Sequence, residues 1–454
     1  MSGPSGTGDD RGSMSRASTG LMKIKVEDLR IGMFVADVGR SWLRHPWPTK
    51  SKLIVGVEEI RQLQDYGITE VMVDPRRSRL RDEPGIPEFG LTSESLGQAR
   101  RVTTEEVTKK VSEAAGQVPD ATCISQVERR KKTRPEDAAD GATLDEELPQ
   151  AKQTYLKALS VTRDFIDDAR AGRNIQVDRV KESLGEMIDS VFRNRDAMLS
   201  LSKLRKFDEY TFSHCLNVTA LVMAVGRRIK LNRGQLMELG LAAMFHDLGK
   251  TRVPEAILNK PSRLTAEEFE IMKTHSVLGE QVILDQMERV PDGVLRVVRH
   301  HHERLDGTGY PDGLAGENFR PGMILCGMAD VYDALSSDRV YHKGMMPHEA
   351  LKVVFSLREK HFPAVWVDRF IQALGIYPVG TVVKLQNGMT GVVVSVNHGC
   401  LTKPKVRGVL DPAGRPVDVP KTYDLSENSL LDWEIKKVID PKPLGLDPAK
   451  YIGL

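Results

Sequence analysis

The residues best suited to chemistry form a run of histidines followed by acids. His300, His301 and His302 are consecutive, and Glu303 and Asp306 come shortly after them. The chain holds only 11 histidines, so three in one run exceed what an ordinary surface loop would carry. Imidazole and carboxylate groups together suit divalent transition metals. The run therefore indicates part of a metal site.

A second cluster lies upstream and reads His246-Asp247-Leu248-Gly249-Lys250. An aspartate beside a histidine can bridge two cations while the imidazole binds one of them. No thiolate belongs to either cluster, which favours iron or manganese. Two such ions ~3.5–4 Å apart clamp a phosphate and lower the pKa of a shared water from about 15.7 toward ~7. These residue types indicate phosphodiester hydrolysis by a metal-bridging hydroxide.

Composition limits the class of protein. A chain of 454 residues holds more than one folding unit, and 40% hydrophobic with 28% charged residues is ordinary for a globular protein. The net charge of +2 is too balanced to predict DNA binding. Cys123, Cys215, Cys326 and Cys400 form no CxxC pair, which predicts free thiols. With no apolar run that could span a bilayer and no signal peptide, we expect a cytoplasmic protein that binds no membrane.

The first half of the chain predicts a small domain, a linker and a helical hairpin. Residues 1–21 are rich in Gly and Ser and are expected to be disordered. Residues 22–75 combine strand-like alternation with one helical stretch, which predicts a small α+β domain. Residues 76–145 are poor in apolar side chains and predict a flexible linker without a packed core. Residues 146–200 regain helical periodicity and predict a helical hairpin.

The second half predicts the elements that position the chemistry. Over residues 201–376 the helical stretches bring ligand-type side chains into a bundle core. His214 continues an apolar helical stripe, and Thr265–Glu268 is a capping box that starts the helix carrying His275. Residues 377–454 alternate like strands, with a hairpin signal at Asn387-Gly388, and predict a β-rich extension. The fold class expected is multidomain and mainly α.

The order of the motifs decides between a structural and a functional interpretation. A lone histidine on an apolar face is more often a core residue, and Gly307–Pro311 alone is typical of a sharp turn. The chain, however, carries all the motifs in sequence: His214; His246-Asp247-x-Gly-Lys; His275; His301-His302-Glu303-x-x-Asp-Gly-x-Gly-Tyr-Pro; and Asp330-x-x-Asp-Ala-Leu. This set resembles the HD-GYP family of cyclic-dinucleotide phosphodiesterases over about residues 200 to 375. The N-terminal domain is similar to an uncharacterised domain often found ahead of it.

The resemblance implies a ligand set for two divalent metal ions, with Asp247 bridging. The ligands of one ion would be His214, His246, Asp247 and Asp330; those of the other would be Asp247, His275, His301 and His302. It implies Asp247 and Lys250 as catalytic residues. The implied substrate contacts are Lys250, Gly309, Tyr310, Pro311 and Arg339.

The implied activity is hydrolysis of cyclic di-GMP to pGpG, GMP or both. In the family, the Gly309–Pro311 loop also contacts signalling proteins, and a homodimer is compatible with the sequence. Two positions depart from relatives. Tyr210 stands where some carry a glutamate associated with a third metal, which favours a two-metal site. Ile324 stands where many carry an arginine, a contact that Arg320 could supply. His300 falls outside the motif.

Two other classes of protein share part of this pattern. A receptor with the same fold would bind cyclic di-GMP without useful turnover, and a phosphohydrolase of the HD superfamily would act on nucleotide monomers. The complete ligand set with Lys250 argues against the receptor, and the Gly309–Pro311 loop argues against the monomer hydrolase. A third interpretation, scaffolding through the basic run Arg129–Lys132, leaves the ligand set unexplained.

Overall fold

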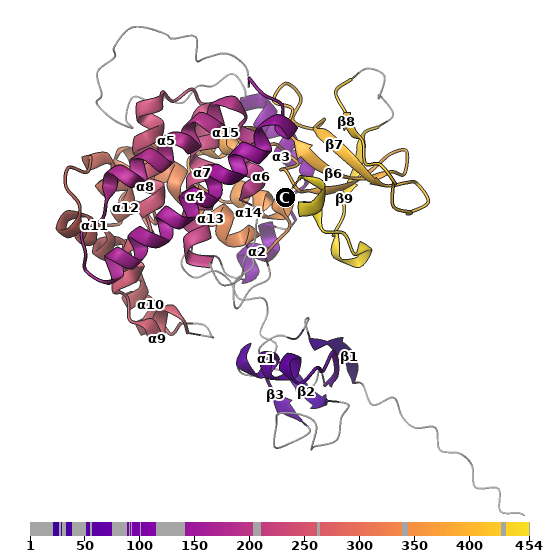
Figure 1. The fold of residues 1–454 in the computed structure, drawn as a ribbon, viewed down its shortest axis with the longest axis horizontal. Coiled ribbons are helices and arrows are strands. Elements are labelled where there is room, and N and C mark those ends of the chain that lie inside the picture. The colour runs from indigo at the N-terminus through magenta and orange to yellow at the C-terminus, as the bar shows by residue number, and fades with distance from the viewer. Residues whose placement is uncertain are drawn as a thin grey trace, which may run out of the picture. The chain divides into compact units, whose positions relative to one another are not determined.

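The structure, a computed structural model, divides the chain into two compact units, residues 1–84 and 85–454. It describes residues 21–26, 29, 33–38, 51–54, 57–74, 89, 91, 93–99, 101–114, 141–202, 210–260, 264–337, 344–427 and 433–453. Figure 1 gives the labels of the elements. The segment expected to be disordered, apart from its last residue, lies outside the described residues.

The first unit is a four-stranded antiparallel sheet with one helix. The sheet order is β1 (Met22–Lys25), β4 (Glu70–Val73), β2 (Phe34–Asp37) and β3 (Lys52–Leu53). Helix α1 (Val57–Asp65) ends before Gly67, whose φ of +66° suits the turn into β4. Val35, Ile54 and Leu63 are fully buried in its core. This α+β unit has the elements that the sequence predicts.

Part of the stretch predicted to be an unpacked linker is folded, and that prediction is wrong there. Helices α2 (Ser93–Ala99) and α3 (Thr104–Glu113) lie within it. Phe89, Leu91, Leu96, Val107 and Val111 are buried in the same core as the helical bundle. The apolar residues are few, but all of these are buried in the large core of the bundle. A few buried side chains are therefore enough to hold this stretch against the bundle. Residues 115–140, with the basic run, lie outside the described part.

Helices α4 (Leu144–Arg170), α5 (Val177–Arg193) and α6 (Arg195–Leu201) form the next layer. A Thr143–Glu146 capping box starts α4, and Gly172, with φ of +70°, begins the turn to α5. Periodicity predicts one helix over 177–200, but Asn194 is extended and divides it. Its side chain accepts a bond from the amide of Ala197 and caps α6.

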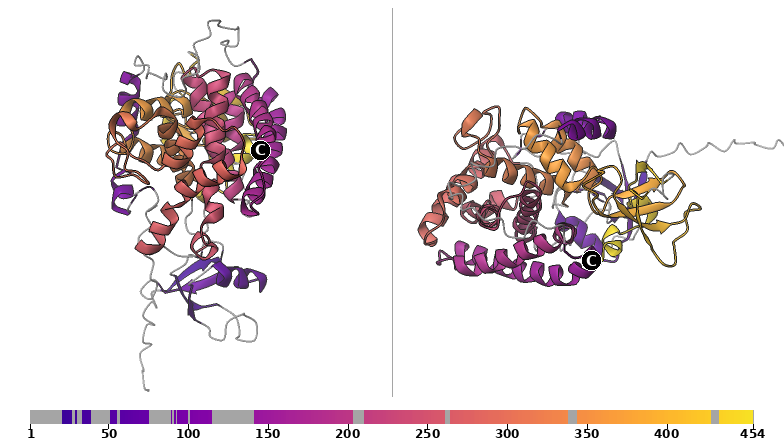
Figure 2. Two further views of the ribbon diagram at one scale, coloured as in Figure 1. Left: turned by 90° about the vertical axis from the view of Figure 1, so that its left-hand side faces the viewer. Right: turned by 90° about the horizontal axis from the view of Figure 1, so that it is seen from above.

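The remaining helices enclose the ligand motifs. They are α7 (Tyr210–Arg228), α8 (Arg233–Phe245), the 3-10 helix η7 (Leu248–Arg252), α9 (Glu255–Leu258), α10 (Ala266–Lys273), α11 (His275–Gln286), α12 (Asp292–His300), the 3-10 helix η8 (Gly316–Asn318), α13 (Pro321–Ser336), α14 (Pro347–Ser356) and α15 (Ala364–Leu374). Every residue of α13 is buried, so this helix is the centre of the bundle. Helices α7, α12, α14 and α15 pack against it. Figure 2 shows the helical bundle from two further sides.

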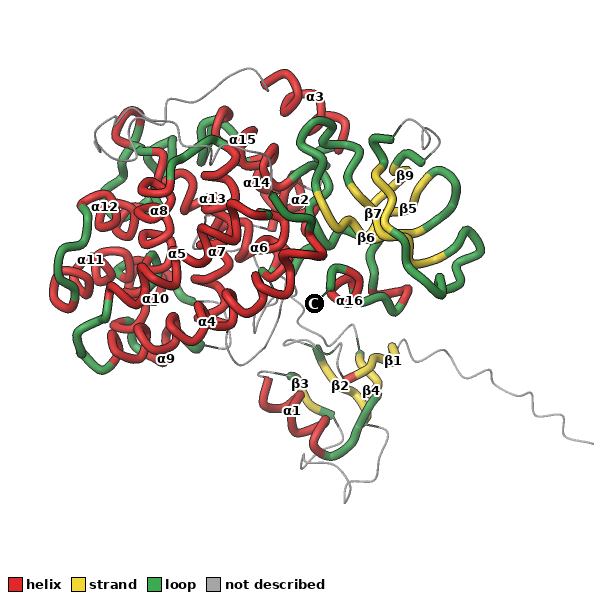
Figure 3. Tube along the Cα trace, turned by 45° about the horizontal axis from the view of Figure 1, so that its top comes forward, coloured by secondary structure: helices red, strands yellow, loops and turns green. Residues whose placement is uncertain are grey.

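The C-terminal strands form a separate sheet at one end of the bundle, as the tube in Figure 3 shows. Its order is β8 (Thr422–Asp424), β7 (Lys405–Leu410), β6 (Thr390–Ser395), β5 (Val382–Leu385) and β9 (Ile435–Val438). The 3-10 helix η10 (Lys442–Leu444) and α16 (Pro448–Tyr451) follow. The hairpin signal is confirmed, since β5 and β6 pair antiparallel around Gly388.

Two expectations about the whole chain can be compared with these elements. Within the described residues, Cys215, Cys326 and Cys400 are free thiols. Among the helices described, none has both the length and the apolar character needed to cross a membrane.

Candidate metal centre and active site

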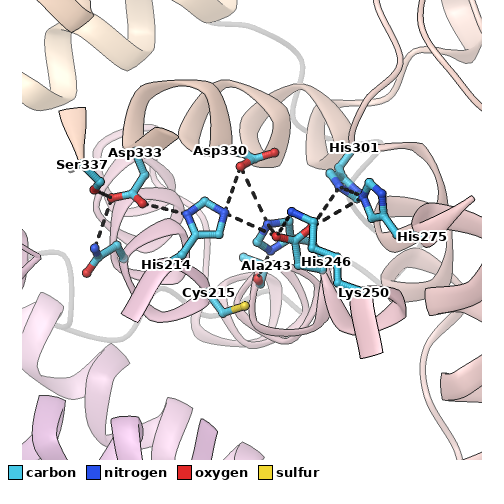
Figure 4. Close-up of polar contacts among 12 residues, drawn as sticks. His214, Cys215, Ala243, His246, Lys250, His275, His301, Asp330, Asp333 and Ser337 are labelled. Carbon is cyan, nitrogen blue, oxygen red and sulfur yellow. Dashed lines mark hydrogen bonds and ion pairs between the residues drawn. The ribbon is translucent and has the colours of Figure 1, made fainter. Parts of the chain in front are cut away.

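Seven ligand-type side chains from six segments of the bundle meet at one buried point. His214 lies on α7, His246 caps the end of α8, and Asp247 precedes η7. His275 begins α11, and His301 caps the end of α12. His302 follows it, and Asp330 lies on α13. All seven are at most 4% exposed. Figure 4 shows His214, His246, His275, His301 and Asp330 converging from these elements.

Asp247 is the hub of the cluster. Its Oδ2 lies 3.5 Å from His214 Nε2 and 3.4 Å from His246 Nε2. Its Oδ1 lies 3.5 Å from His275 Nε2 and 4.0 Å from His301 Nε2. The two oxygens of one carboxylate thus face two different pairs of imidazoles. Such an arrangement is compatible with a carboxylate that bridges two cations.

Asp330 and His302 add to the two sides. Asp330 Oδ1 lies 3.0 Å from His214 Nε2 and 3.9 Å from His246 Nε2. His302 offers a ring nitrogen to a group with Asp247, His275 and His301, in which all ligand atoms lie within 4.8 Å of one another. The structure therefore brings together all seven residues that the sequence singled out as ligands.

Backbone carbonyls fix three of the imidazoles in one tautomer. Nδ1 of His246 lies 2.7 Å from Ala243 O, and Nδ1 of His275 lies 2.7 Å from Met272 O. Nδ1 of His301 lies 2.8 Å from Val298 O. A carbonyl oxygen only accepts, so each Nδ1 must carry the proton and donate it. Each Nε2 is then left with its lone pair directed at the centre, as metal binding requires.

A polar chain from the neighbouring helices orients His214. Its Nδ1 lies 2.7 Å from Asp333 Oδ2, and the amide of Asn217 donates to Asp333 Oδ1 over 3.1 Å. The Tyr155 hydroxyl on α4 in turn donates to Asn217 Oδ1 over 2.8 Å. Sequence reasoning placed Asp333 on the helix of Asp330 but gave it no role. The Asp-x-x-Asp spacing, one helical turn, was the signal that could have found it.

Glycines allow the close packing that sets the site. A Cβ on Gly249 would lie 1.8 Å from His275 O, so only glycine lets η7 approach α11 here. A Cβ on Gly309 would lie 2.4 Å from the Cα of Glu303. These two contacts hold the Asp247 turn and the substrate-loop motif against the ligand helices.

Charge is unevenly distributed over the cluster. Burial lowers the pKa of His214, but its bonds to Asp330 and Asp333 outweigh burial and raise the pKa to about 9. Burial and the neighbouring His246 and His275 lower the pKa of His301 to about 3. Burial raises the pKa of Asp247, yet Lys250 and the surrounding imidazoles hold it well below its usual range. The cluster thus keeps its aspartates ionised at neutral pH.

The residues present fit a pair of divalent cations. His246 Nε2, Asp247 Oδ1 and both ring nitrogens of His302 are buried without a hydrogen-bond partner among the described residues. Leaving several buried polar atoms unpaired in one place costs free energy, about 1–3 kcal/mol each, unless another group binds them. Lone-pair nitrogens and ionised carboxylates are the donors that iron, manganese and similar ions accept.

The loop after the histidines is fastened to the bundle by Glu303. This carboxylate is 1% exposed and accepts from the amides of Asp312, over 2.8 Å, and Leu314, over 3.0 Å. The Tyr310 ring stacks on His302 with centroids 4.7 Å apart, and the Tyr310–Pro311 peptide is cis. The loop predicted from the sequence, Gly309–Pro311, therefore contacts a candidate metal ligand through Tyr310. Glu303 was singled out as acidic, but its fastening role was not foreseen.

The other predicted residues can be placed individually. Lys250 Nζ lies 2.7 Å from Asp247 Oδ2, at the edge of the cluster. Arg339 and the side chain of Tyr210 lie outside the described residues, so their predicted roles are untested. Ile324 is buried, and Arg320 is half-buried before α13. His300 is not part of the cluster; it contacts Asp312 over 2.8 Å.

Three family models match the chain. A domain of unknown function, DUF3391, matches residues 21–180, and an HD domain matches residues 187–364. A KOW domain associated with the HD domain matches residues 382–445. Fold and site together define a protein of the HD class.

Curated relatives narrow the class. The chain is 33% identical over 432 residues to the cyclic di-GMP phosphodiesterase PA4108 of Pseudomonas aeruginosa, covering 95% of this chain and 93% of the relative. It is 33% identical to the response regulator RpfG of Xanthomonas campestris, a cyclic di-GMP phosphodiesterase, over 38% of this chain and 47% of the relative. It is 32% identical to a 3′3′-cGAMP-specific phosphodiesterase of Vibrio cholerae, over 35% of this chain and 36% of the relative. The chain belongs to the HD-GYP family of cyclic di-GMP phosphodiesterases.

Proposed function

We propose that this chain hydrolyses cyclic di-GMP at the Asp247 cluster. The proposal rests on the orientation of the Asp247 carboxylate. Its Oδ2 faces His214 and His246, and its Oδ1 faces His275 and His301. That division suits the simultaneous binding of two cations. When bound, the two metal ions polarise the phosphoryl group and acidify a water for attack on phosphorus.

The protein side chains bind and orient. His214, His246 and Asp330 complete the ligands on one side of Asp247; His275, His301 and His302 complete them on the other. Lys250, half-buried beside Asp247, adds a positive charge next to the position of the phosphate. Its charge would offset the negative charge on the phosphoryl oxygens in the transition state.

The loop would hold the nucleotide. Gly309 keeps the loop close to the ligand helices, and Glu303 holds the backbone of the residues after Pro311. Tyr310 stacks on His302, and its ring centroid lies 6.4 Å from that of His275, so it could orient a guanine or a phosphate of the substrate. We extend the proposal to iron or manganese as the ions, to Arg339 as a further phosphate contact, and to the loop as a docking point for signalling proteins.

The test is product analysis with protein purified anaerobically and loaded with Fe²⁺ or Mn²⁺. Cyclic di-GMP, 3′3′-cGAMP and pGpG are compared as substrates under the same conditions, with chelator-treated protein as the control. We expect metal-dependent conversion of cyclic di-GMP to pGpG, GMP or both. Binding of cyclic di-GMP without turnover would make the protein a receptor, and faster turnover of 3′3′-cGAMP would change the substrate.

A further inference from the structure

One of the imidazoles in the cluster is held differently from the rest. Nδ1 of His246, His275 and His301 is bound by a backbone carbonyl, and Nδ1 of His214 by Asp333. His302 has no such bond to any residue that the structure describes, and both of its ring nitrogens are buried. Hydrogen bonding therefore does not decide its ring orientation or its tautomer.

Ring packing takes the place of the missing hydrogen bond. Tyr310 stacks on His302 at 4.7 Å with an interplanar angle of 24°. Phe89 lies 5.5 Å from the same ring at 45°. Phe89 is 4% exposed, and it lines a small cavity together with His302, Gly327 and Phe362. Aromatic contacts of this kind restrict rotation of a ring that has no polar anchor.

Phe89 does not come from the HD domain itself. It lies outside the HD match at 187–364 and inside the DUF3391 match at 21–180. It follows shortly after residue 84, where the first compact unit ends. Leu91 and Leu96, buried in the core of the bundle, anchor the segment on the C-terminal side of Phe89. An aromatic side chain from the N-terminal family region thus contacts a candidate metal ligand.

We propose that Phe89 is a positioning residue that fixes the ring of His302 for binding of the second metal ion. The inference rests on the proposed function, because it takes His302 as a metal ligand. Loss of Phe89 leaves one side of the His302 ring without its aromatic neighbour, while Tyr310, His275 and His301 still contact the ring. The ring would then sample orientations in which its nitrogen leaves the metal position. Partners that orient a metal-binding histidine change affinity by about 10–100-fold. A ring contact should lie at the lower end, near tenfold.

The experiment measures binding of Mn²⁺ to full-length metal-free protein by calorimetry and by electron paramagnetic resonance. Phe89→Ala is compared with Leu91→Ala. Leu91 is a buried aliphatic residue two positions away and is not one of the rings packed around His302. Phe89→Leu tests whether apolar volume alone restores binding. Thermal unfolding of each variant, monitored by circular dichroism, shows whether the fold is retained.

We expect Phe89→Ala to bind the first Mn²⁺ like the wild type and the second about tenfold more weakly, with loss of the signal from the coupled pair. Leu91→Ala should bind both ions with wild-type affinity. The affinity of Phe89→Leu for the second ion should lie between those of Phe89→Ala and the wild type. Excess Mn²⁺ should restore kcat to Phe89→Ala with KM unchanged. Wild-type binding of both ions by Phe89→Ala, or equal weakening in Leu91→Ala, would overturn the inference. Two Mn²⁺ bound by a wild type that cleaves nothing would refute the proposed function and leave this inference standing.

Discussion

The two sides of Asp247 differ in how they hold a cation. One side combines His214 and His246 with the carboxylate of Asp330, and Asp333 stands behind His214. The other side has Asp247 with His275, His301 and His302, and among the described residues a further carboxylate, that of Asp330, groups with His301 but not with His275 or His302. The first side is anionic and tied together by charge-assisted bonds. On the second side, backbone carbonyls orient His275 and His301, and ring packing orients His302. We expect the first ion to bind more tightly, so metal occupancy should rise in two separate steps.

The largest effect should come from removing what the two sides share. Asp247→Ala should abolish binding of both ions and lower kcat/KM by more than about a hundredfold, beyond the range caused by outer partners. Elemental analysis and turnover of cyclic di-GMP are the measurements, with Asp292→Ala, an exposed acid on α12, as the control. Full metal content in Asp247→Ala would show that Asp247 is not the bridge.

The next change separates the sides. Asp333→Asn keeps the shape of the group behind His214 but removes its charge, so affinity for the first ion should fall about 10–100-fold. The second ion should be affected less, because Asp333 contacts none of its proposed ligands. Stepwise Mn²⁺ titration tests this, with the exposed Asp285→Asn as a matched change. Equal weakening of both ions would mean that the sides do not bind independently.

The ring of Tyr310 packs against His302 and His275 on the second side, and two substitutions separate its roles. Tyr310→Phe keeps the ring that stacks on His302, so the metal content should be unchanged. Any loss of activity in this variant would then come from removal of the hydroxyl group. Tyr310→Ala should lower hydrolysis of cyclic di-GMP more than hydrolysis of a small generic diester, by roughly tenfold, because the small diester has no guanine to stack. Because Tyr310→Ala also removes the ring that stacks on His302, both activities are measured with saturating Mn²⁺. Equal losses on both substrates under that condition would assign Tyr310 to holding the site together.

The smallest effect concerns the metal-free protein and pH. The folded pKa of His214 is raised to about 9, so its stabilising contribution is complete below pH ~6.5 and is lost as pH rises toward 9. The folded pKa of His301 is lowered to about 3. Below pH ~6.5, His301 binds a proton in the unfolded chain but stays neutral in the folded chain. The free energy of unfolding therefore falls as pH drops toward 3.

Substituting glutamine tests the two directions separately. In chelator-treated protein, His214→Gln should flatten the alkaline side of the Tm profile and His301→Gln the acid side. Thermal unfolding from pH 4 to 10 by circular dichroism measures both. Identical profiles for the two variants would show that the asymmetry of charge has no effect on stability.

The sequence allowed the ligands to be predicted because their types, order and local spacing carry the information. His214 continues an apolar helical stripe, and the adjacent pairs His246-Asp247 and His301-His302 stand in motifs whose order resembles the family. Long-range packing carries no such local signal. Glu303 fastens the loop and Asp333 supports His214 only because separate elements meet. Phe89 reaches His302 from a stretch whose few apolar residues predicted a linker; its partner core could not be known from local composition.

The metal centre also lies where helices stop. His246 is the cap at the end of α8, and His301 is the cap at the end of α12. Their imidazoles bind Ala243 O and Val298 O, carbonyls of the last turn, which helix geometry leaves without amide partners. The negative ends of two helix macrodipoles therefore point toward the cations, a contribution of roughly 0.3–1 kcal/mol each. Unlike the carboxylates, these dipoles do not titrate, so this part of the attraction for metal persists at any pH at which the helices remain folded.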